Sequence, residues 1–275
     1  MMNYRIWLGL AGSTLATVLL AQTATAQTAT QRNVLGVEQV SIEDVSVPAD
    51  RPGFGDNATL VPQGHYVAEG GYRYDDNQSG GDTHTVPNIL LRTGINPDLE
   101  LRVGFDGYVL NAPGRDGPGN MSVGAKVRLT DEGRYMPVIS VIPEVSLPTG
   151  DNDVASSKAA PNLRFAWGKS LTDTFAVSGN LNFSEVIDTS GDYNLETAAS
   201  LAGGFSLTNR LSSYVEYYGI FPNGDQSRTG RDTHAVNGGF AFLATPKTQF
   251  DVYAGSGLND VTSDVFAGIG IAHLW

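Results

Sequence analysis

Few side chains in this sequence could carry chemistry. Cysteine is absent from the 275 residues, which excludes thiolate nucleophiles, disulfides and cysteine-based metal sites. The candidate general bases are His65, His84, His234 and His273, and the sequence has no Gly-x-Ser-x-Gly and no His-Glu-x-x-His arrangement. We therefore predict no enzymatic activity, no catalytic residue, no metal site and no cofactor.

Two of the histidines keep an enzymatic alternative open. His84 and His234 each follow an Asp-Thr pair at the start of a predicted strand. An enzyme that acts on lipid or peptide would need such a base beside a nucleophile or an acid pair. A Ser, Asp or Glu within hydrogen-bond reach of either imidazole would favour this alternative over a polar residue that merely begins a strand.

A larger set of ionisable residues falls on the polar side of alternating runs and is predicted to line a common interior. A charged lining could form a passage for small solutes, or its salt bridges could brace the fold; both interpretations stay open. The positive members lie in the first six predicted strands. The predicted lumen-lining residues are Glu69, Arg73, Arg92, Glu100, Arg102, Asp106, Lys126, Arg128, Glu144, Arg164, Glu196, Glu216 and Asp251.

The elements that would position these residues are strands. From residue 64 onward, runs of a length suited to cross a bilayer, about 9 to 11 residues, alternate with turn residues. The connections are short after even-numbered runs and long after odd-numbered runs, which is typical of a bacterial outer-membrane barrel. The twelve predicted strands are 65–74, 84–94, 99–108, 121–129, 136–147, 160–169, 174–184, 193–207, 211–219, 233–244, 248–256 and 264–275.

Within these runs, alternation places the charged residues on one face of each strand and the large apolar residues on the other. Leu99, Leu101 and Val103 share one face of a strand, because successive side chains point to opposite sides. Asp, Glu, Lys and Arg are predicted to avoid the apolar face, as a bilayer would require: a midplane Arg or Lys facing lipid costs roughly 2–4 kcal/mol. A soluble sandwich with an apolar core would show the same alternation, so the ends of the chain decide between the two.

Both ends of the chain favour export to a membrane. Arg5, the apolar stretch 6–20 and the small residues Ala24-Thr25-Ala26 predict a signal peptide over residues 1–26. Residues 27–63 lack periodicity and are predicted to form a periplasmic or lumenal segment, followed by the barrel over 64–275. The last strand alternates up to Trp275, which resembles the sequence read by the barrel assembly machinery.

Composition limits the partners. The formal net charge of -12 makes nucleic acid an improbable ligand and none is expected. The 11 tyrosines and 11 phenylalanines suit aromatic girdles at the membrane interfaces. The expected partners are outer-membrane lipid, the assembly machinery and a small-molecule solute.

Motifs in the first part of the chain resemble a known family. They include Asp50-Arg51-Pro52-Gly53-Phe54, Val61-Pro62-Gln63-Gly64-His65, Leu90-Leu91-Arg92-Thr93-Gly94, Val123-Gly124-Ala125-Lys126 and Ser146-Leu147-Pro148-Thr149-Gly150. The chain thereby resembles the outer-membrane family labelled "putative transporter, meta-pathway of phenol degradation" over most of residues 50–275. The resemblance implies a barrel of this size that moves small, aromatic molecules, and it assigns no functional residue.

The sequence thus predicts an all-β protein, a single antiparallel transmembrane barrel of about twelve strands in the cell outer membrane of a Gram-negative-type envelope. Its expected function is a narrow, porin-like channel for passive transport of small, aromatic or hydrophobic molecules through a charged lumen. Two alternatives stay open besides: an outer-membrane enzyme acting on lipid or peptide, and a non-conducting anchor whose outer loops bind a partner.

Overall fold

The computed structural model describes residues 45–76, 81–111, 115–188, 190–224 and 230–275. The predicted signal peptide lies outside these residues. No helix among them is long and apolar enough to span a membrane.

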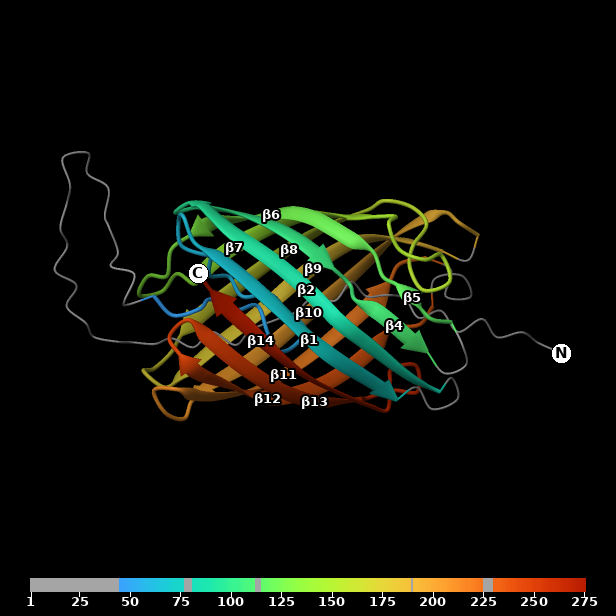
Figure 1. Ribbon diagram of the computed structural model, residues 1–275. Helices are drawn as coiled ribbons and strands as arrows, with labels where there is room; N and C mark the ends of the chain where they lie inside the picture. Colours follow the sequence, from blue (N-terminus) through green and yellow to red (C-terminus); the bar gives the residue numbers. More distant parts are fainter. Residues whose placement is uncertain (1–44, 77–80, 112–114, 189, 225–229) are drawn as a thin grey trace.

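Antiparallel strands form a closed barrel, as predicted (Figure 1). Consecutive strands pair with each other except around β4 and β5: β2 pairs with both β3 and β4, the short β5 pairs with β4, and β3 pairs with β6. β1 pairs with β14 as well as with β2, so the wall is closed around its circumference. The strands are β1 (Tyr66–Asp76), β2 (Asp82–Asn96), β3 (Leu99–Phe105), β4 (Tyr108–Asn111), β5 (Gly117–Pro118), β6 (Met121–Thr130), β7 (Val138–Leu147), β8 (Ala160–Ser170), β9 (Phe175–Ile187), β10 (Tyr193–Ser206), β11 (Leu211–Pro222), β12 (Thr233–Thr245), β13 (Thr248–Gly257) and β14 (Val265–Leu274).

These elements correspond to twelve wall strands because β3 and β4 together occupy one position beside β2 and β5 is a two-residue bridge. The predicted strand 99–108 is therefore wrong in one respect: it is interrupted at Asp106-Gly107. Gly107 has φ of +95°, a left-handed conformation that breaks extended pairing and that glycine adopts without strain.

The two faces of the wall differ as the alternation predicts. Outward residues such as Leu201, Val215 and Ile269 are 57%, 57% and 58% exposed, whereas inward residues on the same strands, such as Ala202, Glu216 and Phe266, are buried. Four charged residues of the described strands contradict the expectation that the outer face carries none. Asp76 ends β1 and is paired with Asp82, which begins β2, in register with the outward Val265 of β14. Lys169 and Glu185 alternate with Trp167 and Phe183, but each lies near a strand end, and Lys169 pairs with Glu132 at 3.1 Å.

The ends of the barrel carry different connections. We call the end with the short turns, such as 97–98, 207–210 and 246–247, the turn end, and the opposite end the loop end. The C-terminus lies at the turn end (Figure 1). There the Trp275 backbone N–H donates to the Tyr66 carbonyl at 2.9 Å, which extends the seam between β14 and β1 to the last residue.

Lipid contact on the outer face gives a direct prediction. Leu201→Arg places a cation on the outward side near the middle of β10 and is expected to lower the free energy of unfolding in a bilayer by about 2–4 kcal/mol. Leu201→Met should be close to neutral because it keeps an apolar side chain there. Urea titration of the protein refolded into phospholipid vesicles, read by gel mobility, measures both. Equal stability of the Arg and Met variants would contradict a lipid-facing position.

Candidate functional site

Residues 45–63 lie inside the barrel, and we call them the lumenal segment. The segment begins at the turn end, where the Val47 N–H donates to the Pro246 carbonyl at 2.9 Å. It returns to the same end, where Gln63 bridges to Gly94 of β2. Between these points the chain makes one excursion into the lumen (Figure 1). Val47, Ala49 and Val61 pack on inward apolar residues of the wall, including Leu243 and Leu274, and this anchors the base of the segment.

Asp50 is the electrostatic centre of the segment. Its carboxylate accepts a hydrogen bond from Arg102 Nη1 at 2.7 Å and from Lys126 Nζ at 2.9 Å, and all three residues are at most 3% exposed. Burial alone would raise the pKa of the Asp50 carboxyl, but the charges of Arg92, Lys126 and Arg102 hold it below its ordinary value. Asp50 is therefore ionised at every physiological pH and attracts the cations of β2, β3 and β6.

Carboxylates of the wall bind the backbone of the segment. Glu69 of β1 accepts the N–H groups of Asp50 and Arg51, at 2.9 and 3.1 Å. Glu100 of β3 accepts the Val61 N–H at 2.8 Å. A buried backbone N–H without a partner is costly, so these acceptors are what allow an irregular segment to lie in the interior.

Arg92 of β2 links these two carboxylates. Its guanidinium contacts Glu100 at 2.7 Å and Glu69 at 2.9 Å, and it also donates to the Pro48 carbonyl. One wall cation therefore orients both acceptors of the segment backbone.

The Arg51 side chain points away from the cations that surround Asp50 and toward β13. Its guanidinium forms a two-point ion pair with Asp251 of β13, with both N–O distances 3.1 Å. Inward glycines provide the space: a Cβ at Gly71 or Gly270 would lie 2.5 or 2.0 Å from the Arg51 side chain. Glycine at these two positions is thus explained by close approach of the guanidinium.

Asp56 binds the segment to the cations of β3 and β8. It pairs with Arg102 at 2.8 Å and with Arg164 of β8 at 3.2 Å, and Arg164 in turn contacts Glu144 of β7 at 2.8 Å. The carboxylates of Asp50 and Asp56 therefore neutralise a row of cations on β3, β6 and β8. Removing one member of such a buried set leaves an uncompensated charge and is expected to be strongly destabilising.

The innermost part of the segment is Gly53-Phe54-Gly55, which we call the tip. Glu216 of β11 accepts the N–H groups of Phe54 and Gly55 at 2.7 and 3.0 Å. The Phe54 ring stacks on Tyr218, with centroids 4.2 Å apart and planes 4° apart. Gly53 has φ of +112°, which lets the chain turn at this point, and a Cβ on Gly55 would lie 2.7 Å from the Ser200 hydroxyl.

Most of the predicted site residues surround the lumenal segment, and four lie away from it. Arg73 pairs with Asp75 toward the loop end, and Arg128 pairs with Asp131 at the turn end. Asp106 lies in the interruption between β3 and β4, and Glu196 is partly buried on β10. The residues around the segment are Glu69, Arg92, Glu100, Arg102, Lys126, Glu144, Arg164, Glu216 and Asp251.

Sequence reasoning missed two groups of residues at this site. Asp50, Arg51 and Asp56 were not assigned a role because their segment has no periodicity. The second group, which we call the aromatic cluster, consists of Tyr214, Tyr218, Tyr253 and Phe266, all buried inside the barrel. The expectation of aromatic girdles is wrong for these rings. Strict alternation could have found three of them, since Tyr214 and Tyr218 share a face with Glu216, and Tyr253 shares one with Asp251.

The histidines that could support an enzymatic function contact tyrosines. His84 Nδ1 lies 2.7 Å from the Tyr72 hydroxyl, and His234 Nδ1 lies 2.7 Å from the Tyr217 hydroxyl. A tyrosine hydroxyl does not supply the carboxylate that orients a catalytic imidazole. Both pairs lie near the loop end, on the outward face of the wall.

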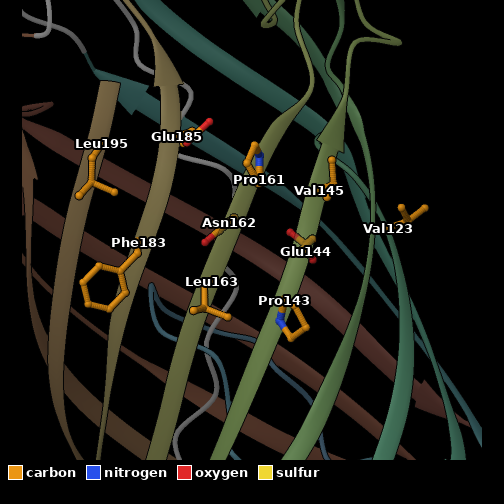
Figure 2. A pocket seen from close by; sticks show the side chains of 10 residues that line it. All are labelled: Val123, Pro143, Glu144, Val145, Pro161, Asn162, Leu163, Phe183, Glu185 and Leu195. Carbon is orange, nitrogen blue, oxygen red and sulfur yellow. The ribbon is translucent and has the colours of Figure 1, made fainter. Parts of the chain in front are cut away.

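A shallow groove of about 420 Å³ crosses the wall from β6 to β10 (Figure 2). Most of its lining alternates outward and is apolar, and the prolines of β7 and β8 contribute short rings there. The groove therefore belongs to the apolar outer surface. Its lining residues are Val123, Pro143, Glu144, Val145, Pro161, Asn162, Leu163, Phe183, Glu185 and Leu195.

Two solved structures with a similar fold are an outer-membrane channel and a porin. The COG4313 outer membrane channel from Pseudomonas putida F1 is 15% identical in sequence and superposes with a TM-score of 0.64, over 82% of this chain and 99% of that chain. The NanC porin is 9% identical, with a TM-score of 0.54 over 76% of this chain and 98% of its own. These likenesses establish the outer-membrane barrel fold.

Comparison by sequence identifies the family. No curated protein matches the chain. The family model described as "Putative MetA-pathway of phenol degradation" matches residues 49–275, which include the end of the lumenal segment that carries Asp50 and the whole barrel. The chain is an outer-membrane β-barrel and belongs to this family.

Proposed function

We propose that the protein is a narrow channel for the passive passage of small, aromatic or hydrophobic molecules and that the lumenal segment is its gate. The observation that carries this proposal is the reach of the segment. Its side chains and backbone bind wall residues on β1, β6, β8, β11 and β13, at positions all around the barrel. A segment held on every side occupies the cross-section, so the arrangement described above corresponds to the closed state.

The width of the barrel supports a channel that one short segment can close. Eight strands leave an interior filled by side chains, whereas 16 to 18 strands leave an open aqueous pore. A wall of twelve strands lies between these limits. Displacement of a single segment therefore suffices to change the interior from filled to open.

Opening requires the tip, together with the flanking Asp50 and Asp56, to withdraw while the base stays in place. The base is held by apolar packing of Val47, Ala49 and Val61, which does not depend on the tip. The tip is held by Glu216 and by one aromatic stack. Withdrawal of Asp50 and Asp56 would leave Arg102, Lys126 and Arg164 facing the lumen, so that the open passage has a charged wall.

The solute class follows from the size of the lumen and from its aromatic cluster, and the family description is consistent with it. A non-conducting anchor is the alternative function. It predicts that the segment stays in place under all conditions and that folded protein carries no current.

A disulfide between the tip and the wall tests the gate. Gly55→Cys and Ser200→Cys place two thiols within bonding reach, and Asn180→Ala removes the amide oxygen that would lie 1.8 Å from the new Cβ. We expect the oxidised protein to be closed in planar bilayers and the reduced protein to show conductance steps. The chain has no cysteine of its own, so no other disulfide can form.

The double variant Ser200→Cys with Asn180→Ala is the matched control and should conduct equally with and without reductant. Equal conductance of the oxidised and reduced triple variant would contradict gating by the segment. Absence of current from every folded variant would favour the anchor.

Loss of the central charge should loosen the gate. Asp50→Asn leaves Arg102 and Lys126 without their closest counter-charge, which we expect to disfavour the closed state by about 3–5 kcal/mol. The fraction of time that single channels are open should rise, and Asp131→Asn, which removes an exposed partner of Arg128, should leave it unchanged. Because the pKa of Asp50 is lowered, its contribution to closure should be constant from pH 8 to 5 and weaken only in strong acid. An unchanged open fraction in Asp50→Asn would show that this ion pair does not hold the gate.

A further inference from the structure

The aromatic cluster differs in polarity from the rest of the inner wall. Inward positions of this barrel are mostly polar, yet the four rings of the cluster are 1–7% exposed and lie together on β11, β13 and β14. Tyr218 and Phe266 are in ring contact, with centroids 6.3 Å apart. The cluster therefore forms an apolar, aromatic patch on the inner wall.

The lumenal segment covers this patch with a single ring. Phe54 lies parallel to Tyr218 at 4.2 Å, a stacked geometry that contributes beyond the burial of area. The Phe54 ring is attached to the irregular tip and to no strand. In shape and in chemistry it is equivalent to a free molecule with one benzene ring that occupies the patch.

The groups around the patch indicate which rings it would accept. The Arg73 guanidinium carbon lies 4.6 Å from the centre of the Phe266 ring, but its charge is paired with Asp75 at 2.6 Å. The buried Tyr214 hydroxyl has no hydrogen-bond partner among the described residues. A neutral ring with one hydroxyl group could stack on Tyr218 and pair with Tyr214, whereas an aromatic carboxylate would meet Arg73, whose charge Asp75 already neutralises.

We propose that Phe54 occupies a binding site for one neutral, monocyclic aromatic molecule, and that such a molecule displaces Phe54 and releases the tip. This inference rests on the proposed function in one respect: it takes the tip as the movable part of the gate. Binding and opening are then coupled, because the solute and Phe54 compete for the same face of Tyr218. The channel would thus open in response to its own class of solute.

The position of Ser200 offers a reporter of tip release. Gly55 covers its hydroxyl, and Ser200→Cys introduces one thiol of similar size into a chain without cysteine. The rate at which a maleimide labels this thiol, in protein reconstituted into lipid nanodiscs, measures how often the tip is away. We expect benzyl alcohol to raise the rate by about two- to tenfold, the range of an aromatic stack. Cyclohexylmethanol, which has a similar size but no aromatic ring, should leave the rate unchanged.

Variants at adjacent tyrosines separate the site from a general solvent effect. In the Ser200→Cys background, Tyr218→Leu should raise the basal rate and abolish the response to benzyl alcohol, while Tyr218→Phe should retain the response. Tyr217→Leu, on the outward face of the same strand, should behave like the parent. Equal acceleration by both alcohols, no acceleration by either, or a response that persists in Tyr218→Leu would overturn the proposal.

The labelling rate does not depend on conduction. A response to benzyl alcohol without any current would therefore support the binding site and refute the channel. Conduction without a response would do the reverse.

Discussion

The whole structure depends on the absence of water in the hydrocarbon core of the bilayer. Every polar group of a strand must then pair along the wall or point inward, and a closed barrel satisfies the backbone requirement. The consequence is a concentration of ionisable side chains in a small interior volume. Lumenal charges such as Arg102, Lys126 and Arg164 need counter-charges there, because an isolated buried charge is costly.

The lumenal segment meets this need. Asp50 and Asp56 supply carboxylates to the cations of β3, β6 and β8, and Arg51 supplies a cation to Asp251. In return, Glu69, Glu100 and Glu216 accept the backbone N–H groups of a segment that forms no sheet of its own. These ion pairs and hydrogen bonds between the segment and the wall explain why a segment without periodicity has a defined position. They also explain why that position is in the lumen rather than on the surface.

Much of the fold could be predicted from the sequence, because the alternation of apolar and polar residues with a period of two indicates which face of each strand contacts lipid. The order of the strands, their number and the exclusion of charge from mid-strand outward positions all follow from it. The interruption at Gly107 could not be predicted, since a glycine within a run does not reveal its φ. The partners of Glu69 or Asp251 were equally inaccessible, because alternation gives the face of a residue but not what lies opposite. The prediction for Tyr214 and Tyr218 failed for a different reason. Alternation places both on the same face as Glu216, but tyrosine is a residue type typical of membrane interfaces.

The gate and the aromatic binding site both require that residues 45–63 are bound inside the barrel by hydrogen bonds to the wall. Amide hydrogen exchange of the protein in lipid nanodiscs, followed by mass spectrometry, tests it most directly. The amides of Asp50, Arg51, Phe54, Gly55 and Val61 donate to wall carboxylates and should exchange far more slowly than those of the exposed turn 131–135. Exchange of these amides as fast as that of the turn would show that the segment is not bound in the lumen, and neither the gate nor the binding site could then exist as described.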